Sequence, residues 1–109
     1  MSYDVSFNIP TGAVKVATIA DFNHTYNCAK MFKVALGGLS ITDLDGMSSH
    51  AITPKLREAV ETMKNPDLRG IFESMNPKNG WGSYETALSF LEKLYETAKD
   101  HPMTFIQVS

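Results

Sequence analysis

The sequence predicts a small α+β fold, with an antiparallel three-stranded sheet and three to four helices packed on one face. Two observations place the sheet in an N-terminal hairpin and a C-terminal strand: the first residues alternate in polarity, and the last are rich in β-formers. A third observation places the helices between them, because several segments show the i, i+3, i+4, i+7 apolar spacing. The expected order is ββαααβ, in a single domain over residues 1–109.

The N-terminal region predicts a β-hairpin followed by a loop. Residues 3–9 alternate Tyr, Val, Phe and Ile with Ser, Asp and Asn, which indicates a strand with one buried face. Pro-Thr-Gly at 10–12 is typical of a turn, and the β-branched stretch 13–19 predicts the second strand. Residues 21–27 are polar and rich in helix-capping types, so we expect a loop that leads into a helix.

The middle of the chain predicts two helices and a short helical piece. The first helix begins at Cys28, the first residue of an apolar stripe, and ends at Gly37-Gly38, since glycine commonly follows the last helical residue. The second begins at Thr53-Pro54, which combines a capping hydroxyl with a proline suited to the first turn, and ends at Asn65-Pro66. A short helical segment is also predicted for residues 66–75.

The C-terminal region gives the clearest helix and the last strand. An apolar stripe over residues 84–98 predicts about four helical turns, with Ser83 as the cap. Residues 103–108 predict a strand that joins the hairpin. Because so small a sheet exposes its edge strands, a homodimer is one expected state of the protein.

Composition and charge limit the expected partners. The net charge is −2 and the ten Lys and Arg residues are scattered, so we expect no duplex nucleic acid as a partner. No apolar run approaches the roughly 20 residues that span a bilayer, and no signal peptide is recognisable. We therefore expect a cytoplasmic protein without a membrane partner. The single cysteine, Cys28, fits a reducing compartment.

Two polar segments directly before predicted helices form the candidate binding site. The first is 23–27, and the second is 76–84, where the only tryptophan, Trp81, lies between two glycines. Free N–H groups at a helix start attract anions, and an indole framed by glycines can stack on a planar ring. The predicted ligand-binding residues are Asn23, His24, Thr25, Asn27, Lys78, Asn79, Trp81 and Tyr84.

The same residues also have structural interpretations, which stay open. Asn, Ser and Thr before a helix are commonly caps, and a loop tryptophan often fills the core. His24 and Cys28, four residues apart, are the one pair that resembles a base and a nucleophile, yet Cys28 lies on the apolar face of its predicted helix. The three histidines are isolated, and no cofactor motif occurs, so we expect neither a metal nor a cofactor.

Two motifs carry a resemblance to a known group of proteins. The run NPKNGWGSYE at 76–85, together with Asn23, Thr25 and Asn27, resembles small uncharacterised proteins common in bacteriophage genomes. In that group an NPxNGWGxY motif precedes the last helix and an N-x-T-x-N segment precedes an earlier one. The resemblance implies a phage or prophage origin and expression in the bacterial host cytosol, and it implies no known reaction.

These observations lead to three hypotheses about function. The first is a non-enzymatic phage-type protein that sequesters a small anionic, nucleotide-like signal and so counters host defence. The second is a protein–protein inhibitor that docks on a host enzyme through Tyr26, Trp81 and Tyr84 as aromatic anchors. The third is a small hydrolase that uses His24.

Overall fold

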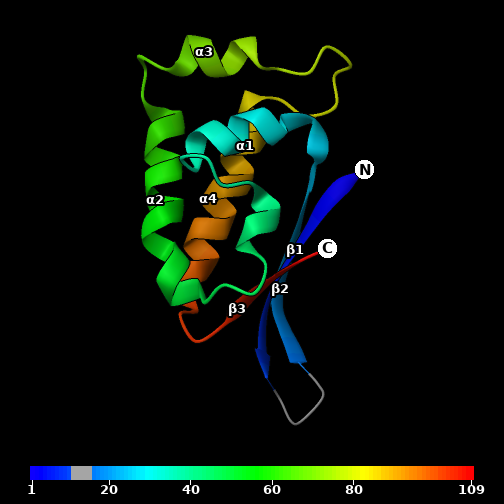
Figure 1. Cartoon of the computed structure of the whole chain (residues 1–109), viewed down its shortest axis with the longest axis vertical. Helices are drawn as coiled ribbons and strands as arrows, with labels where there is room; N and C mark the ends of the chain where they lie inside the picture. Colours follow the sequence, from blue (N-terminus) through cyan, green and yellow to red (C-terminus); the bar gives the residue numbers. More distant parts are fainter. Residues whose placement is uncertain (11–15) are drawn as a thin grey trace.

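The computed structural model describes residues 1–10 and 16–109 and confirms the α+β fold (Figure 1). The sheet is antiparallel, in the order β2-β1-β3, and consists of β1 Ser2–Pro10, β2 Val16–Thr25 and β3 Phe105–Val108. The C-terminal strand therefore joins the N-terminal hairpin, as predicted, and the structure shows that it pairs with β1, the central strand. The parts of the predicted turn and second strand that fall on 11–15 lie outside the described residues.

Helices cover one face of the sheet. Figure 1 shows α2 and α4 side by side, with α3 across one end of the molecule, and α4 also packs against β2. No helix of residues 1–10 and 16–109 is both long and apolar enough to cross a membrane. The helical elements between β2 and β3 are η1 Tyr26–Cys28, α1 Ala29–Ala35, η2 Ile41–Leu44, α2 Ser49–Lys64, α3 Arg69–Ser74 and α4 Tyr84–Asp100.

The hydrophobic core lies between the sheet and these helices. On β1, Tyr3, Val5 and Phe7 are buried, whereas Asp4 is exposed on the opposite, open face, which is the predicted alternation. The helix α4 contributes a stripe with helical spacing to the same core. The largest fully buried side chains are those of Phe7, Phe32, Phe72, Met31, Leu36, Ile41, Leu44, Leu56, Met63, Leu91, Leu94 and Ile106.

Several predicted helix ends are confirmed. Helix α1 ends before Gly37 and Gly38, both with positive φ, and the N–H of Gly38 donates to the carbonyl of Lys33. Ser83 caps α4 in a reciprocal pair with Thr86, whose N–H donates to the Ser83 hydroxyl at 3.2 Å. Helix α3 lies within the predicted helical piece at 66–75.

The prediction of a loop at 21–27 is wrong for most of its length, because β2 continues to Thr25. Asp21 and Asn23 are exposed on the open face, whereas Phe22 and His24 turn toward the helices and are half-buried and buried. The segment thus has the period of two of a strand. The sequence resembles a loop because polar residues occupy both faces: the open face is polar, and the buried face includes a histidine. The alternation between apolar and polar residues is therefore not visible.

The predicted start of the second helix is also wrong, since α2 begins at Ser49 and Pro54 lies within it. Ser49 is buried, its N–H donates to the Thr104 carbonyl at 3.0 Å, and the two hydroxyls are 2.6 Å apart. Thr53 does not cap the helix but donates its hydroxyl to the Ser49 carbonyl at 2.7 Å. A contact with a distant residue therefore extends the helix beyond its local start signal.

Candidate functional site

The two predicted segments meet in an open groove of ≈ 520 Å³. It lies where the N-terminal end of β1, the end of β2 and the loop at 76–82 come together. Five of the eight predicted residues line it, and two residues missing from the prediction, at the start of the chain, complete it. We call it the Trp81 groove. Its lining residues are Met1, Ser2, Asn23, Thr25, Asn27, Asn79 and Trp81.

A glycine allows the loop to approach the end of β2. A Cβ atom on Gly82 would lie 2.7 Å from Cγ2 of Thr25 and 2.9 Å from Sγ of Cys28, and the φ of Gly82 is +90°. Either condition disfavours any other residue. In the structure this glycine allows β2 and η1 to approach the loop closely. This contact brings Trp81 beside the strand end.

Asparagines hold the shape of the loop. The Oδ1 atom of Asn79 accepts from the N–H of Trp81 at 2.9 Å, which forms an Asx turn. The Oδ1 atom of Asn76 accepts from the N–H of Tyr84 at 2.7 Å and so connects the loop to the start of α4. The indole is consequently presented by a loop whose backbone is fixed at both ends.

Trp81 does not fill the core, because 69% of its surface is exposed. The alternative interpretation as a core residue is therefore wrong. Met1, which also lines the groove, is exposed as well. An indole that is open to solvent beside polar side chains offers one apolar face to a planar ring.

The side chains that line the groove are neutral, and several of them form hydrogen bonds. The amide nitrogen of Asn23 donates to Oγ of Ser2 at 2.9 Å and to Oδ1 of Asp4 at 2.7 Å. The amide oxygen of Asn23 accepts no hydrogen bond from residues 1–10 and 16–109. Thr25 accepts from the N–H of Asn27 at 3.3 Å and retains its hydroxyl hydrogen for donation. No lining residue has a charged side chain. The groove therefore suits a ring with neutral polar edges.

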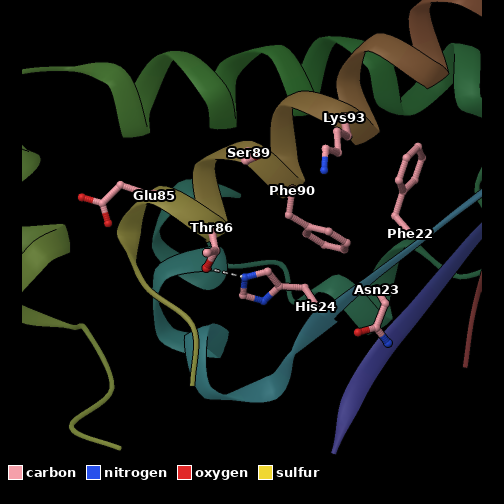
Figure 2. A pocket seen from close by; sticks show the side chains of 8 residues that line it. All are labelled: Phe22, Asn23, His24, Glu85, Thr86, Ser89, Phe90 and Lys93. Atoms are coloured by element: carbon pink, nitrogen blue, oxygen red, sulfur yellow. Dashed lines mark hydrogen bonds between the residues drawn. The ribbon is translucent and has the colours of Figure 1, made fainter. Parts of the chain in front are cut away.

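His24 lies on the opposite side of β2, in a cleft of ≈ 340 Å³ beside α4 (Figure 2). Its ring packs against Phe32 and Phe90, with centroids 5.1 and 5.2 Å away. Nδ1 lies 2.9 Å from the Thr25 carbonyl and Nε2 lies 3.0 Å from Oγ1 of Thr86. A carbonyl only accepts, so Nδ1 carries the proton of the neutral ring and Nε2 is left as an acceptor. The single hydroxyl hydrogen of Thr86 lies between two acceptors, Nε2 of His24 at 3.0 Å and the Ser83 carbonyl at 3.1 Å.

The neutral form of His24 is favoured. Burial lowers its pKa below the ordinary value of 6.5, and the hydrogen bond to the Thr25 carbonyl opposes this shift. Through Thr86 the ring is attached to the cap of α4. His24 thus connects β2 to α4, and the structure does not bring it into the Trp81 groove.

The surroundings of Cys28 do not favour a nucleophile–base pair with His24. Cys28 is buried, as predicted, and its thiol lies 3.8 Å from the Ser83 carbonyl, to which it donates. Burial raises the pKa of Cys28, which reduces its thiolate fraction, although the bond to Ser83 opposes this. Both ring nitrogens of His24 are engaged elsewhere.

Tyr84 and Lys78 also lie outside the groove. Tyr84 is buried, its hydroxyl donates to the Met63 carbonyl at 2.6 Å, and the Arg69 guanidinium lies over its ring at 5.1 Å. Lys78 is exposed on the loop and does not line the Trp81 groove. Tyr84 therefore supports α4 from inside the core rather than contributing to a binding surface.

Two of the first three N–H groups of α4 are occupied by acceptors of the protein itself. That of Tyr84 donates to Asn76 and that of Thr86 donates to Ser83. These are the groups in which the sequence suggested an anion site. In residues 1–10 and 16–109, no cluster of three His, Cys, Asp or Glu residues suits a metal ion. The polar chemistry of the groove therefore rests on side chains.

Met1 and Ser2 are the lining residues that sequence reasoning missed. They reach the groove because β1 pairs with β2 in a register that sets Ser2 opposite Thr25. No local pattern around Met1 or Ser2 announces this, because a register is a relation between two strands.

Comparison with known proteins adds no family to this description. No family model matches the chain, and no curated protein or solved structure has significant similarity to it. The resemblance to bacteriophage proteins stays a prediction, and the geometry of the Trp81 groove is what bears on function.

Proposed function

We propose that this chain is a non-enzymatic binding protein whose Trp81 groove takes a small, nucleotide-like ligand with a planar ring. The observation that carries the proposal is the convergence of two distant polar segments around one exposed indole. Stacking of a nucleobase on an aromatic side chain contributes about 1–3 kcal/mol. The side chains of Asn23, Thr25, Asn27 and Asn79 then orient the ring through hydrogen bonds.

The ring of the ligand supplies most of the affinity. No charged side chain lines the groove, and α4 has already paired the N–H groups of Tyr84 and Thr86. A phosphate attached to the ring extends out of the groove, where Lys78 on the same loop is its candidate partner. Binding should accordingly depend only weakly on salt, since screening acts on charges.

The proposed role is sequestration of such a ligand in the cytosol of a bacterial host. Support comes from the resemblance to phage proteins and from the surroundings of His24 and Cys28, which bring no general base to a nucleophile. A protein that only binds needs a groove and no convergent acid–base set. Binding to a host-defence signal fits both features.

Trp81 is the only tryptophan, so its fluorescence reports on the groove alone. We expect saturable quenching by at least one member of a panel of mononucleotides and cyclic dinucleotides. By calorimetry, Trp81→Ala should weaken that binding about ten-fold or more, whereas Trp81→Phe keeps an aromatic platform and should weaken it less. Ile71→Ala is the matched control, because Ile71 is an exposed apolar residue of α3 outside the groove.

The result that contradicts this proposal is equally definite. If folded protein shows neither quenching nor heat of binding with any nucleotide at millimolar concentration, the nucleotide-type ligand is wrong. If Trp81→Ala and Asn27→Ala leave the affinity unchanged for a ligand that does bind, the groove is not its site.

Exposure of Trp81 also favours a second candidate function, inhibition of a host enzyme by protein–protein contact. Of the three predicted aromatic anchors, only Trp81 is exposed, because Tyr26 packs against Tyr3 at 4.4 Å and Tyr84 is buried. A single exposed tryptophan is a frequent interface hot spot. A host protein retained from lysate by the wild type and lost with Trp81→Ala would favour this candidate over the small ligand.

A further inference from the structure

The two edges of the sheet differ in how they are covered. Along β3, the N–H of Gly46 donates to the Ile106 carbonyl at 2.7 Å, and the N–H of Ile106 donates to the Met47 carbonyl at 2.8 Å. The Asp45 carboxylate accepts from the N–H of Val108 at 2.8 Å. In residues 1–10 and 16–109, no strand lies along the outer side of β2, and no loop forms a backbone hydrogen bond with Asp21 or Asn23. The edge of β2 is therefore the open one.

The alternation of hydrogen bonds shows which groups of β2 face outward. Asp4 and Ser109 exchange two N–H···O=C bonds of 3.0 and 2.9 Å, so Asp4 directs its backbone toward β3. Its neighbour Val5 then directs its backbone toward β2, where it lies opposite Phe22. Phe22 thus uses its N–H and C=O on β1, and the residues before and after it present theirs to the open edge.

We propose that this edge binds a second copy of the same chain. The two β2 strands run antiparallel, with a two-fold axis at Phe22, and form one continuous six-stranded sheet. Asp21 of each copy then pairs with the partner's Asn23, and their outward N–H and C=O groups form the new hydrogen bonds. This interface is independent of whether the Trp81 groove binds a ligand.

Two features determine the position of the two-fold axis: which side chains would lie opposite each other, and how much of β2 pairs regularly. An axis at Asp21 would set two carboxylates directly opposite each other, which is destabilising. The irregularity between Phe7 and Asn8 limits regular pairing to 20–25, and Phe22 lies near the middle of that stretch. An axis at Phe22 also sets the two phenyl rings at the close, non-hydrogen-bonded spacing, where aromatic pairs are favourable.

Charges on α4 fit the same axis. Glu85, Ser89 and Lys93 are spaced by four residues, share one face of α4, and line the cleft beside Phe22 (Figure 2). A two-fold axis beside Ser89 brings Glu85 toward the partner's Lys93, and the reverse pair forms by symmetry. Glu85 has only a long contact, 3.8 Å, to Arg69 in its own chain. The surface is therefore self-complementary in charge.

Cross-linking tests the register directly. Analytical ultracentrifugation should give a dimer mass for the wild type, and mild oxidation of Phe22→Cys should produce a disulfide-linked dimer. Asp21→Cys is the register control, because each new thiol then faces the partner's Asn23 and should cross-link poorly. Buried Cys28 should stay unlinked in the wild type. A monomer mass at hundreds of micromolar, or equal cross-linking of both variants, overturns the proposal.

Two further variants remain informative if Phe22→Cys folds poorly. The N–H of Asp21 faces outward, so Asp21→Pro removes no bond to β1 and should give a folded monomer. Lys93→Glu should raise the dimer dissociation constant several-fold, and Glu85→Lys with Lys93→Glu should restore it. If the double charge exchange fails to restore the dimer that Lys93→Glu weakened, the axis at Phe22 is wrong.

Discussion

Single residues in this protein have roles that their types do not reveal. His24 is the type expected at a catalytic or binding site, yet its two nitrogens bond to Thr25 and Thr86 and its ring packs between two phenylalanines. Trp81 is the type expected in a core, yet it is exposed. The residue type alone cannot distinguish a structural role from a binding role, because the surrounding residues determine whether a polar or aromatic side chain is free to contact a ligand.

Burial of neutral His24 should make stability depend on pH. Its folded-state pKa lies below the ordinary 6.5 of the unfolded chain, so the unfolded chain takes up the proton first as the pH falls. Stability should therefore be complete above about pH 6.5, decline below it, and stop declining once the pH is below the folded pKa. Urea unfolding at several pH values between 8 and 5 measures this.

A matched pair of variants isolates the contribution of His24. His24→Gln should flatten the decline below pH 6.5, whereas His50→Gln, at an exposed position of α2, should leave it in place. Identical pH dependence of the wild type and His24→Gln would show that another group is responsible.

At the scale of elements, the groove depends on contact between the loop at 76–82 and the end of β2. The Asx turn at Asn79 orients the loop, and the missing side chain of Gly82 lets it approach Thr25. The loop itself has no apolar stripe to bury, so its position comes from these few contacts. The element that presents Trp81 is for that reason sensitive to one methyl group.

Gly82→Ala should destabilise the fold by roughly 1–3 kcal/mol, because it combines a strained φ with close contacts to Thr25 and Cys28. Gly80→Ala is the matched control: its φ is +76°, but a Cβ there meets nothing within 4 Å. It should cost less, about 1 kcal/mol. Urea unfolding followed by far-UV circular dichroism measures both, and equal losses would show that backbone strain alone matters.

At the scale of the whole molecule, a polar network connects all three strands on the open face. The hydroxyl of Thr18 in β2 donates to Oδ1 of Asn8 in β1 at 2.8 Å, and Nδ2 of Asn8 donates to Oε1 of Gln107 in β3 at 2.9 Å. Asn8 is only 1% exposed. Low solvent access makes these bonds more consequential than those of an exposed amide.

Asn8→Ala should lower the free energy of unfolding by about 1–3 kcal/mol, because it removes a buried amide that hydrogen-bonds to side chains of both neighbouring strands. Asn23→Ala is the control: Asn23 lies on the same face and makes two hydrogen bonds, but it is exposed. Its loss should cost less, since water can replace the amide. Chemical denaturation compares the two, and an equal cost would mean that the network does not connect the sheet.

The sequence by itself determined the elements in which one face is apolar and the other polar. Alternation in β1 and the stripe of α4 predict both elements, and glycine or a capping serine predicts where α1 ends and α4 begins. These signals are local because they concern residues within two turns of each other. Five residues of the Trp81 groove were also identifiable, because they lie in two polar segments that the sequence shows directly, one of them around a glycine-framed tryptophan.

Only the tertiary structure decided where β2 and α2 extend and which residues meet. β2 reaches Thr25 because an open face tolerates polar residues, and α2 starts at Ser49 because Ser49 bonds to Thr104. Strand register brings Ser2 to the groove, and packing takes His24 and Tyr84 away from it. Local sequence patterns indicate which face of a helix or strand is buried. Which other element packs against that face depends on the folded chain as a whole.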